Sequence, residues 1–167
     1  MTVSDPSSST PVARGRLIVL CGLPGSGKTT TARLLAETDR EVRLCSDEWM
    51  TLLGFDLYDD EARFRTETLQ QQFPEELLRV GCTVVYESGG WTRVERDALR
   101  ERARATGAAV ELRFLDVPLD LLWKRVSHRN HDLPSVTAIV EREDLVRWWS
   151  EFQRPKADEQ AQYDPAR

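Results

Sequence analysis

The sequence predicts an α/β fold of three layers, in which a parallel sheet of about four or five strands carries helices on both faces. Two observations lead to this prediction. Short, continuous apolar runs are typical of strands buried on both sides, and they alternate with segments whose apolar residues recur at helical spacing. Strands that alternate with helices form βαβ units and therefore a parallel sheet. The 167 residues, 40% of them hydrophobic, suffice for one domain with a substantial core.

The first ordered element is expected after residues 1–14, which are rich in Ser, Thr and Pro and predict a disordered tail. The remainder, residues 15–167, is predicted to form a single domain. Within it, residues 17–21 read LIVLC and predict a strand that is buried on both faces. A glycine-rich loop follows this strand, and a helix is predicted from about residue 27 to residue 37.

The next elements predicted are a strand at residues 41–45 and a short helix that Ser46 or Asp47 could cap. Residues 59–80 have a mostly helical pattern. Pro74 should kink or divide that helix, because proline lacks a backbone N–H and clashes with the preceding turn.

A third buried strand is predicted at residues 82–86 and a fourth at residues 109–115. Between them, Thr92 and Glu95 have the spacing of a capping box, in which both side chains satisfy free backbone donors at the start of a helix. Gly107 is a natural C-terminal stop for that helix.

Two more helices are predicted in the last third of the chain. Residues 119–126 carry apolar side chains at helical spacing, and a polar stretch interrupts the pattern from His128 to Ser135. The last amphipathic helix is predicted to carry four apolar residues: Ile139, Val140, Val146 and Trp149.

Composition limits the classes of function. The net charge of −5 argues against a broad nucleic-acid-binding surface, although it does not decide the question. The sequence has no apolar run near the roughly 20 residues that span a bilayer, and its N-terminus lacks a secretory pattern. We therefore expect a cytoplasmic protein without a membrane partner. The three cysteines lack zinc-site spacing and are expected to be small buried side chains.

The segment GLPGSGKT after the first strand is a full match to the pattern G-x-x-x-x-G-K-[ST] of phosphate-binding loops. Glycines allow many backbone N–H groups to converge on one phosphate group, and the start of the following helix adds its positive dipole end. Lys28 is expected to reach the β- and γ-phosphates of ATP, and the Thr29 hydroxyl to ligate Mg²⁺. The predicted nucleotide-binding residues of the loop are Gly22, Leu23, Pro24, Gly25, Ser26, Gly27, Lys28, Thr29 and Thr30.

With this loop the chain resembles the compact P-loop kinases that include chloramphenicol phosphotransferase, zeta toxins and the kinase domain of polynucleotide kinase. The resemblance extends over about residues 16–160 and is sharpest in CGLPGSGKTTTARLL, CSDEWM, VVYESGGWTRVERDALRERA, LDVPLDLLWKRVSHRN and FQRPKADEQ. It implies the P-loop NTPase fold and an ATP-dependent kinase that phosphorylates a hydroxyl group of a small molecule. It does not identify that acceptor.

Asp47 is the candidate for orienting or deprotonating the attacking hydroxyl. It follows the second predicted strand, and ligands of parallel sheets bind beyond the carboxyl ends of the strands. Kinases similar to this chain carry an Asp at this place, which the segment SDEW matches, while a simple helix cap is the alternative reading. Trp49 could line the acceptor pocket, or it could belong to the core.

Glu87 ends the third predicted strand, where a carboxylate can hold Mg²⁺ through water. Related sequences usually have Asp at this point, so Glu87 departs from the pattern and could instead face the acceptor. Arg93, at the mouth of the same strand, could contact the acceptor or a phosphate. The arginines that follow it alternate with acidic residues, which is typical of a solvated helix face.

Arg125 and Arg129 lie four residues apart and share one face if the helix continues that far. In similar kinases, arginines of a lid helix neutralise phosphate charge in the transition state, which implies a mobile lid at about residues 128–136. The resemblance also suggests that residues 152–155 fold back on the adenine, while a loose tail is the alternative.

The sequence also bears on functions other than a small-molecule kinase. A GTP-binding switch needs an Asn-Lys-x-Asp reader, but the one asparagine, Asn130, precedes a histidine. A mechanical ATPase would need a larger domain and an Asp-Glu pair. Three alternatives stay open: a polynucleotide 5′-hydroxyl kinase, a toxin-like nucleotide-sugar kinase and an ATP-binding module without turnover.

Overall fold

A computed structural model describes residues 14–37, 41–87, 90–131 and 139–166, and the predicted α/β fold is confirmed in them. The elements in chain order are β1 (Arg16–Cys21), α1 (Lys28–Leu35), β2 (Glu41–Leu44), α2 (Ser46–Leu52), α3 (Asp60–Gln72), α4 (Pro74–Arg79), β3 (Thr83–Tyr86), α5 (Arg93–Ala105), β4 (Ala109–Phe114), α6 (Leu119–His131), α7 (Arg142–Glu151) and α8 (Ala157–Gln160). None of the helices in these ranges has the length and apolar character needed to span a bilayer.

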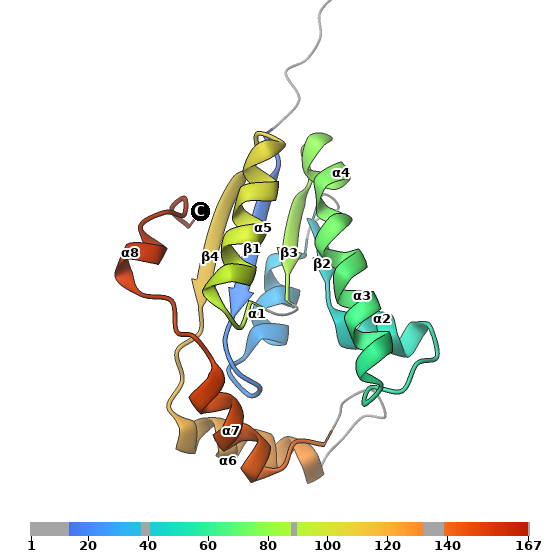
Figure 1. Ribbon diagram of the computed structural model, residues 1–167, viewed down its shortest axis with the longest axis vertical. Coiled ribbons are helices and arrows are strands. Elements are labelled where there is room, and N and C mark those ends of the chain that lie inside the picture. Colours follow the sequence, from blue (N-terminus) through green and yellow to red (C-terminus); the bar gives the residue numbers. More distant parts are fainter. Residues whose placement is uncertain (1–13, 38–40, 88–89, 132–138, 167) are drawn as a thin grey trace, which may run out of the picture.

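The four described strands form one sheet in the order β2-β3-β1-β4, and every pair is parallel. Ile18 of β1 lies opposite Val85 of β3 on one side and Glu111 of β4 on the other. All strands therefore end at the same edge of the sheet, which is the lower edge in Figure 1. Loops that leave this edge are brought together in space although they are far apart in sequence.

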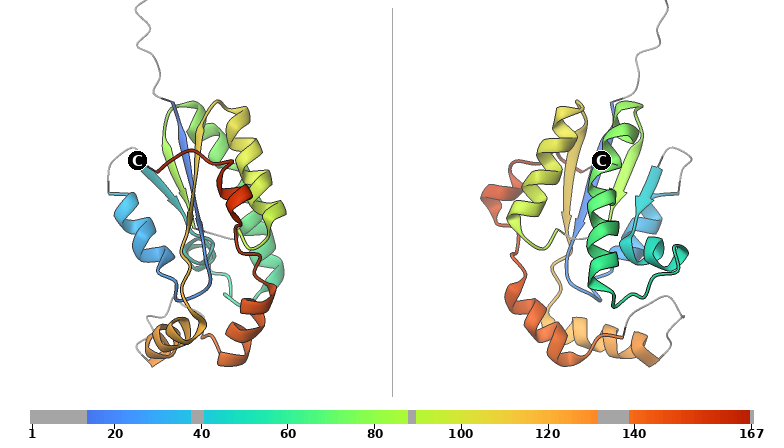
Figure 2. Two further views of the ribbon diagram at one scale, coloured as in Figure 1. Left: turned by 90° about the vertical axis from the view of Figure 1, so that its left-hand side faces the viewer. Right: turned by 45° about the vertical axis from the view of Figure 1, so that its right-hand side comes forward.

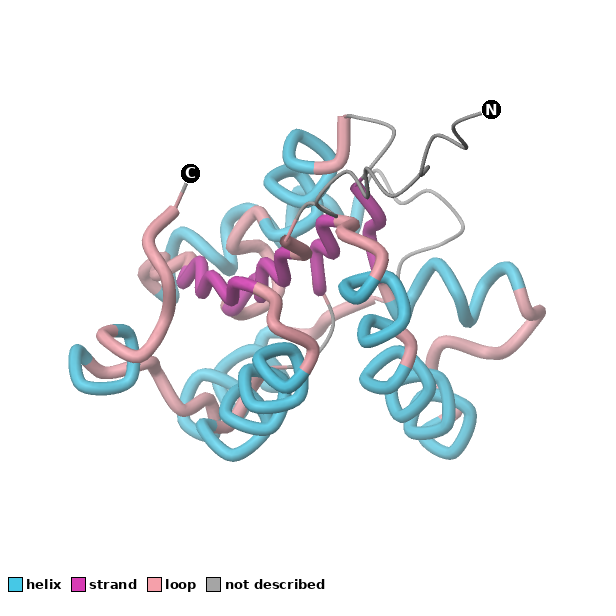
Figure 3. Tube along the Cα trace, turned by 90° about the horizontal axis from the view of Figure 1, so that it is seen from above, coloured by secondary structure: helices cyan, strands magenta, loops and turns pink. Residues whose placement is uncertain are grey.

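Helices cover the sheet on both faces, as Figure 3 shows along the strand layer. On one face, α1 packs against Ile18, Leu20 and Val85, which are buried together with Ala32. The other face carries α5 with α3 and α4, and Figure 2 shows α1 and α5 on opposite sides. The core on that second face contains Leu17, Val19, Leu44, Leu78, Val84, Tyr86, Leu99, Ala103, Ala108 and Val110.

Helices α6 and α7 lie across the carboxyl edge of the sheet and pack on the loop after β1 (Figure 1). Gly25 of this loop has φ +83°, and a Cβ atom there would lie 2.9 Å from Val126 Cγ2 and 3.0 Å from the Leu122 carbonyl oxygen. Only glycine accommodates both this backbone conformation and this close approach. The packing therefore places the arginines of α6 beside the loop.

Most of the local predictions are confirmed. Pro74 separates α3 from α4, and Thr92 and Glu95 form the capping box of α5. The cap of α2 was predicted wrongly: Cys45 occupies the cap position without a side-chain hydrogen bond, and Ser46 and Asp47 lie in the first turn. Asp47 is therefore available for other contacts.

The polar stretch after α6 also differs from the prediction. Helix α6 continues to His131, so residues 128–131 are helical; residues 132–136 lie outside the described ranges, and the lid at about residues 128–136 stays a prediction. Ile139 and Val140 precede α7 instead of belonging to it. The short helix α8 was not predicted, because four residues carry too little periodicity to be recognised.

The acidic–basic alternation in α5 proved a poor guide to its exposure. Arg96 was assigned to a solvated face but is fully buried, and it binds both carboxylate oxygens of Glu159 on α8, at 2.6 and 2.9 Å. Arg14, assigned to the N-terminal tail, donates to the Gly107 carbonyl oxygen at 2.7 Å. Residues 1–13 of that tail lie outside the described ranges, and the domain boundary stays a prediction.

Candidate nucleotide and acceptor site

Lys28 is the first residue of α1, and its ammonium group turns back onto the backbone of the loop that precedes it. Its Nζ atom donates to the carbonyl oxygens of Gly22 and Leu23, at 2.8 and 3.2 Å. Burial lowers the pKa of Lys28, and the carboxylates of Glu87 and Asp47 oppose this shift. A partly buried cation whose hydrogen bonds, within the described residues, go to neutral carbonyl groups suits an anionic ligand.

The first turn of α1 offers further groups to an anion. Gly27 caps the helix with φ +101° and has no side chain that could accept from the free N–H groups of the first turn. The hydroxyl of Ser26 is buried and has no hydrogen-bond partner among the described residues. Free N–H groups and an unpaired hydroxyl fit the phosphate oxygens that the sequence pattern predicts.

Thr29 lies one residue beyond the lysine and meets the end of β3. Its hydroxyl donates to Oε1 of Glu87, a residue that is only 6% exposed. The other carboxylate oxygen, Oε2, accepts from Arg43 of β2 at 2.6 Å. A hydroxyl and a carboxylate side by side are a donor set that Mg²⁺ binds together with phosphate oxygens and water. The two residues predicted for the metal are thus neighbours in the structure.

Asp47 lies in the first turn of α2, on the same side of the sheet edge as the lysine. Its Oδ1 atom accepts from Arg63 of α3 at 2.8 Å, and the side chain is 45% exposed. Asp47 also acts electrostatically on both Lys28 and Arg129. The structure therefore brings a solvent-accessible carboxylate to the group of cations around the loop.

The two arginines predicted on α6 face the loop. Arg125 donates to the carbonyl oxygen of Gly25 at 3.2 Å. Arg129 is half-buried, and its Nε atom has no hydrogen-bond partner in the described part of the chain. Burial lowers the pKa of Arg129, and Asp47 opposes that shift. A guanidinium with an unpaired buried N–H, close to a phosphate loop, suits a bound phosphate oxygen.

Two other candidates have their described contacts elsewhere. Trp49 packs against the core under α5 and forms an edge contact with Phe73, with ring centroids 5.9 Å apart. Arg93 is paired with Asp158 of α8 at 2.7 Å. These contacts join neither residue to Lys28 or Asp47, and their assignment to the acceptor stays a prediction.

The segment predicted to reach the adenine lies near the loop. Phe152 is buried and stacks on Phe114, and the Arg154 guanidinium lies 3.8 Å from the ring centroid of Trp149. A small pocket between this segment and Leu23 is lined by nine residues: Leu23, Phe114, Leu115, Asp116, Val117, Leu122, Trp149, Phe152 and Arg154. Its volume of about 10 Å³ corresponds to roughly one water molecule, so the contact of this segment with the adenine stays a prediction.

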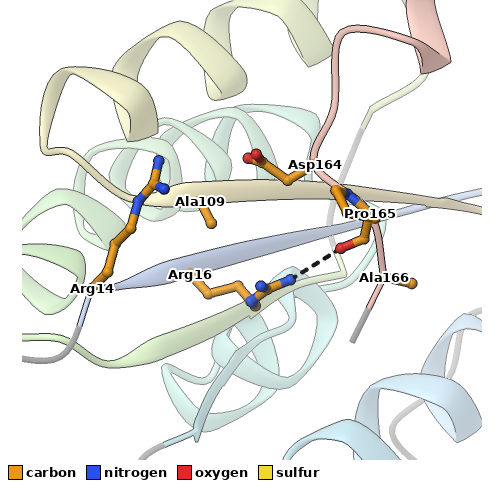
Figure 4. Close-up of a pocket in the computed structure, with 6 residues that line it drawn as sticks. All are labelled: Arg14, Arg16, Ala109, Asp164, Pro165 and Ala166. Carbon is orange, nitrogen blue, oxygen red and sulfur yellow. Dashed lines mark hydrogen bonds between the residues drawn. The ribbon is translucent and has the colours of Figure 1, made fainter.

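A second cavity, of about 240 Å³, opens at the opposite edge of the sheet (Figure 4). There Arg16 donates to Glu111 and to the Pro165 carbonyl oxygen, at 3.0 and 3.5 Å. The carboxylate of Asp164 accepts from the backbone N–H of Val110 at 2.7 Å. Ligands of parallel sheets bind at the carboxyl ends of the strands, whereas this cavity lies at the amino ends. Its polar groups hold the C-terminal segment on the sheet.

Sequence reasoning missed two residues of the site, Arg43 and Arg63. Both are single arginines in segments where neighbouring charges are common, and their partners lie on other elements. Arg43 of β2 lies opposite Val85 of β3, and Val85 precedes Glu87 by two residues. A cross-strand register would have been needed to recognise this pair, and the sequence pattern does not supply it.

A family model described as an AAA domain matches residues 17–155. Among solved structures, one from the Pnkp1/Rnl/Hen1 RNA repair complex is similar over 96% of this chain, with a TM-score of 0.70 and 19% identity. A gluconokinase from Sinorhizobium meliloti is similar with a TM-score of 0.58 and 23% identity. The alignment covers 87% of this chain and 79% of the gluconokinase. The APS kinase CysC from Mycobacterium tuberculosis is similar with a TM-score of 0.59 and 23% identity. The alignment covers 86% of this chain and 85% of the APS kinase.

These likenesses show a P-loop kinase-like fold. Because all three identities are below 25%, they show the fold alone. The chain spans about half, 49%, of the matched chain of the RNA repair complex. No curated protein matches the sequence.

Proposed function

Since the chain belongs to the AAA domain family, we propose that it is an ATP-dependent kinase that transfers the γ-phosphate of ATP to a hydroxyl group of a small molecule. One observation carries the proposal: the phosphate loop with its partly buried Lys28, the Thr29–Glu87 pair and the accessible Asp47 meet at one edge of the sheet. Transfer of a phosphoryl group needs these parts and little covalent chemistry. The kinase domain would comprise residues 15–167.

In this proposal the backbone N–H groups of the loop and Lys28 hold the phosphates of ATP. Lys28 would leave the carbonyl oxygens of Gly22 and Leu23 for the β- and γ-phosphates. Thr29 and Glu87 would hold Mg²⁺, the latter through water. Bound Mg²⁺ neutralises charge on the phosphate oxygens.

Asp47 would accept a hydrogen bond from the acceptor hydroxyl and orient its oxygen toward the γ-phosphorus. Arg63 holds one oxygen of Asp47 and leaves the other for the acceptor. Arg129 and Arg125 would contact the charge that spreads over the transferred phosphoryl group. Residues 152–155 would lie against the adenine.

A transfer assay with labelled ATP tests the proposal. The full-length protein, ATP and Mg²⁺ are incubated with a panel of hydroxylated acceptors: sugars, nucleosides, antibiotics and oligonucleotides with a free 5′-hydroxyl. We expect label to appear on at least one small-molecule acceptor. Label only on oligonucleotides would favour a polynucleotide kinase, and binding of ATP without transfer to any of the four classes would favour a non-catalytic module.

Replacing Lys28 by alanine is expected to weaken ATP binding about 10- to 150-fold, because a hydrogen bond to a charged group contributes about 1.5–3 kcal/mol. The variant should remain folded, since the lysine binds loop carbonyl groups rather than core residues. Calorimetric titration with a non-hydrolysable ATP analogue measures the loss. Lys124→Ala, which removes an exposed lysine of α6, is the matched control and should bind like wild type. Unchanged affinity in Lys28→Ala would contradict the assignment of the loop.

A further inference from the structure

Arg43 is the least exposed arginine in the ion-paired network of Glu87, Glu48 and Arg33. Its guanidinium donates to Oε2 of Glu87 at 2.6 Å and forms a second, short ion pair with Glu48. The side chains of Arg43 and Glu87 are only 14% and 5% exposed. Arg33, on the outer side of Glu48, is 3.7 Å from that carboxylate and is 68% exposed.

We propose that Arg43 is a positioning residue for the metal side of the site: it fixes one carboxylate oxygen of Glu87 so that the other faces Thr29. The inference rests on the proposed function, because it concerns how the Thr29–Glu87 pair receives Mg²⁺. It concerns residues of this chain alone, and Arg43 would contact neither ATP nor the metal.

The need for such a residue follows from the length of the glutamate side chain. Compared with aspartate, glutamate has one more rotatable bond, so its carboxylate can take more positions. In this chain the carboxylate is held at both ends, by Thr29 on one oxygen and by Arg43 on the other. The backbone supports the same arrangement, since the N–H of Glu87 donates to the Leu44 carbonyl oxygen at 2.9 Å.

The guanidinium itself is fixed in turn. Glu48 binds its NH2 group and Glu87 its NH1 group, so the planar fork is held from both sides and cannot turn away from Glu87. Burial by itself would lower the pKa of Arg43, but the hydrogen bonds that it donates to Glu48 and Glu87 outweigh this effect and raise the pKa. Partners that orient a metal ligand commonly change metal affinity 10- to 100-fold when they are removed.

Three possible roles of Arg43 predict different effects of its removal on Mg²⁺ binding, so they can be distinguished by experiment. If Arg43 merely placed a positive charge near the metal, its removal would strengthen Mg²⁺ binding. If it positions Glu87, its removal weakens the effect of Mg²⁺ on nucleotide binding. A purely structural role would lower the melting temperature and leave the effect of Mg²⁺ unchanged.

The experiment measures the affinity of the full chain for a non-hydrolysable ATP analogue with and without Mg²⁺. In Arg43→Gln we expect the gain in affinity from Mg²⁺ to fall about tenfold, while the affinity without Mg²⁺ stays within about twofold of wild type. Arg43→Lys, which keeps the charge but loses the fork, should recover only part of the gain. Arg33→Gln is the matched control and should resemble wild type.

A double variant tells whether Arg43 acts through Glu87. Glu87→Gln should lose the gain from Mg²⁺, and adding Arg43→Gln should cause no further loss. In the metal-free protein Arg43→Gln should lower the melting temperature, because it leaves the buried Glu87 without its cation, and Glu87→Gln should restore part of the loss. This metal-free coupling is measured without any ligand.

The outcomes separate the two levels of the proposal. An unchanged or larger gain from Mg²⁺ in Arg43→Gln, or additive losses in the double variant, would overturn the role of Arg43 and leave the kinase proposal intact. Wild-type protein that does not bind the analogue, yet shows the metal-free coupling, would overturn the proposed function and confine Arg43 to holding Glu87.

Discussion

Replacing Asp47 by asparagine is expected to slow the transfer of the γ-phosphate about 10²- to 10⁴-fold, the usual contribution of a positioned acid or base. Asparagine can still accept a hydrogen bond from Arg63 and from the acceptor, but it cannot take up the proton of the hydroxyl. ATP affinity should change less than threefold, because Asp47 acts on Lys28 and Arg129 only electrostatically and is 45% exposed. Transfer of label under single-turnover conditions measures the effect.

The control for this prediction is Asp60→Asn, which removes an exposed carboxylate from the first turn of the neighbouring helix α3. That variant should transfer phosphate at the wild-type rate. An Asp47→Asn protein that is as fast as wild type would show that Asp47 is not the catalytic carboxylate. Weaker ATP binding by the same factor as the slower transfer would instead place Asp47 in nucleotide binding.

The phosphate loop and the order of the elements were predictable because the signals are local. Gly25, Lys28 and Thr29 lie within five consecutive residues, and the pattern that joins them requires a strand before and a helix after, both of which the sequence also predicts. The capping box of Thr92 and Glu95 spans four residues and was found for the same reason.

Contacts between distant elements were not predictable from the pattern. Arg96 belongs to a charged stretch that indicates solvent exposure and Arg43 to a predicted strand, yet the carboxylate partners of both come from other elements. Glu159 lies 63 residues after Arg96. Which arginine of an alternating series turns inward depends on the packing of the C-terminal segment, and that packing has no periodic signature.

The end of α6 was also not predictable from the pattern. The polar residues from His128 onward interrupt the apolar spacing, but the backbone hydrogen bonds of a helix are satisfied whatever the polarity of its side chains, so α6 runs on to His131. Near the end of α6, the side-chain amide nitrogen of Asn130 donates to the carbonyl oxygen of Val140 at 2.8 Å. The chain before α7 is thus attached to the end of α6.

The buried pair of Arg96 and Glu159 leads to the largest stability effect that we expect. Arg96 is fully buried, and besides Glu159 it donates to the carbonyl oxygen of Gly90 at 2.8 Å. Glu159→Gln leaves this guanidinium without a counter-ion inside the protein, which should lower the free energy of unfolding by about 3–5 kcal/mol. For a domain of this size the melting temperature should fall by roughly 6–20 °C, measured by calorimetry or circular dichroism.

Asp158→Asn is the matched control for this prediction, because it makes the same chemical change one residue earlier on α8. Its carboxylate binds Arg93 at the surface, where water screens the ion pair, so the melting temperature should hardly change. In Arg96→Met/Glu159→Leu, apolar side chains replace both buried charges, and much of the lost stability should return. Equal melting temperatures for Glu159→Gln and Asp158→Asn would mean that the buried pair contributes no more than the exposed one. The C-terminal segment would then be held on the domain by its apolar contacts and backbone hydrogen bonds.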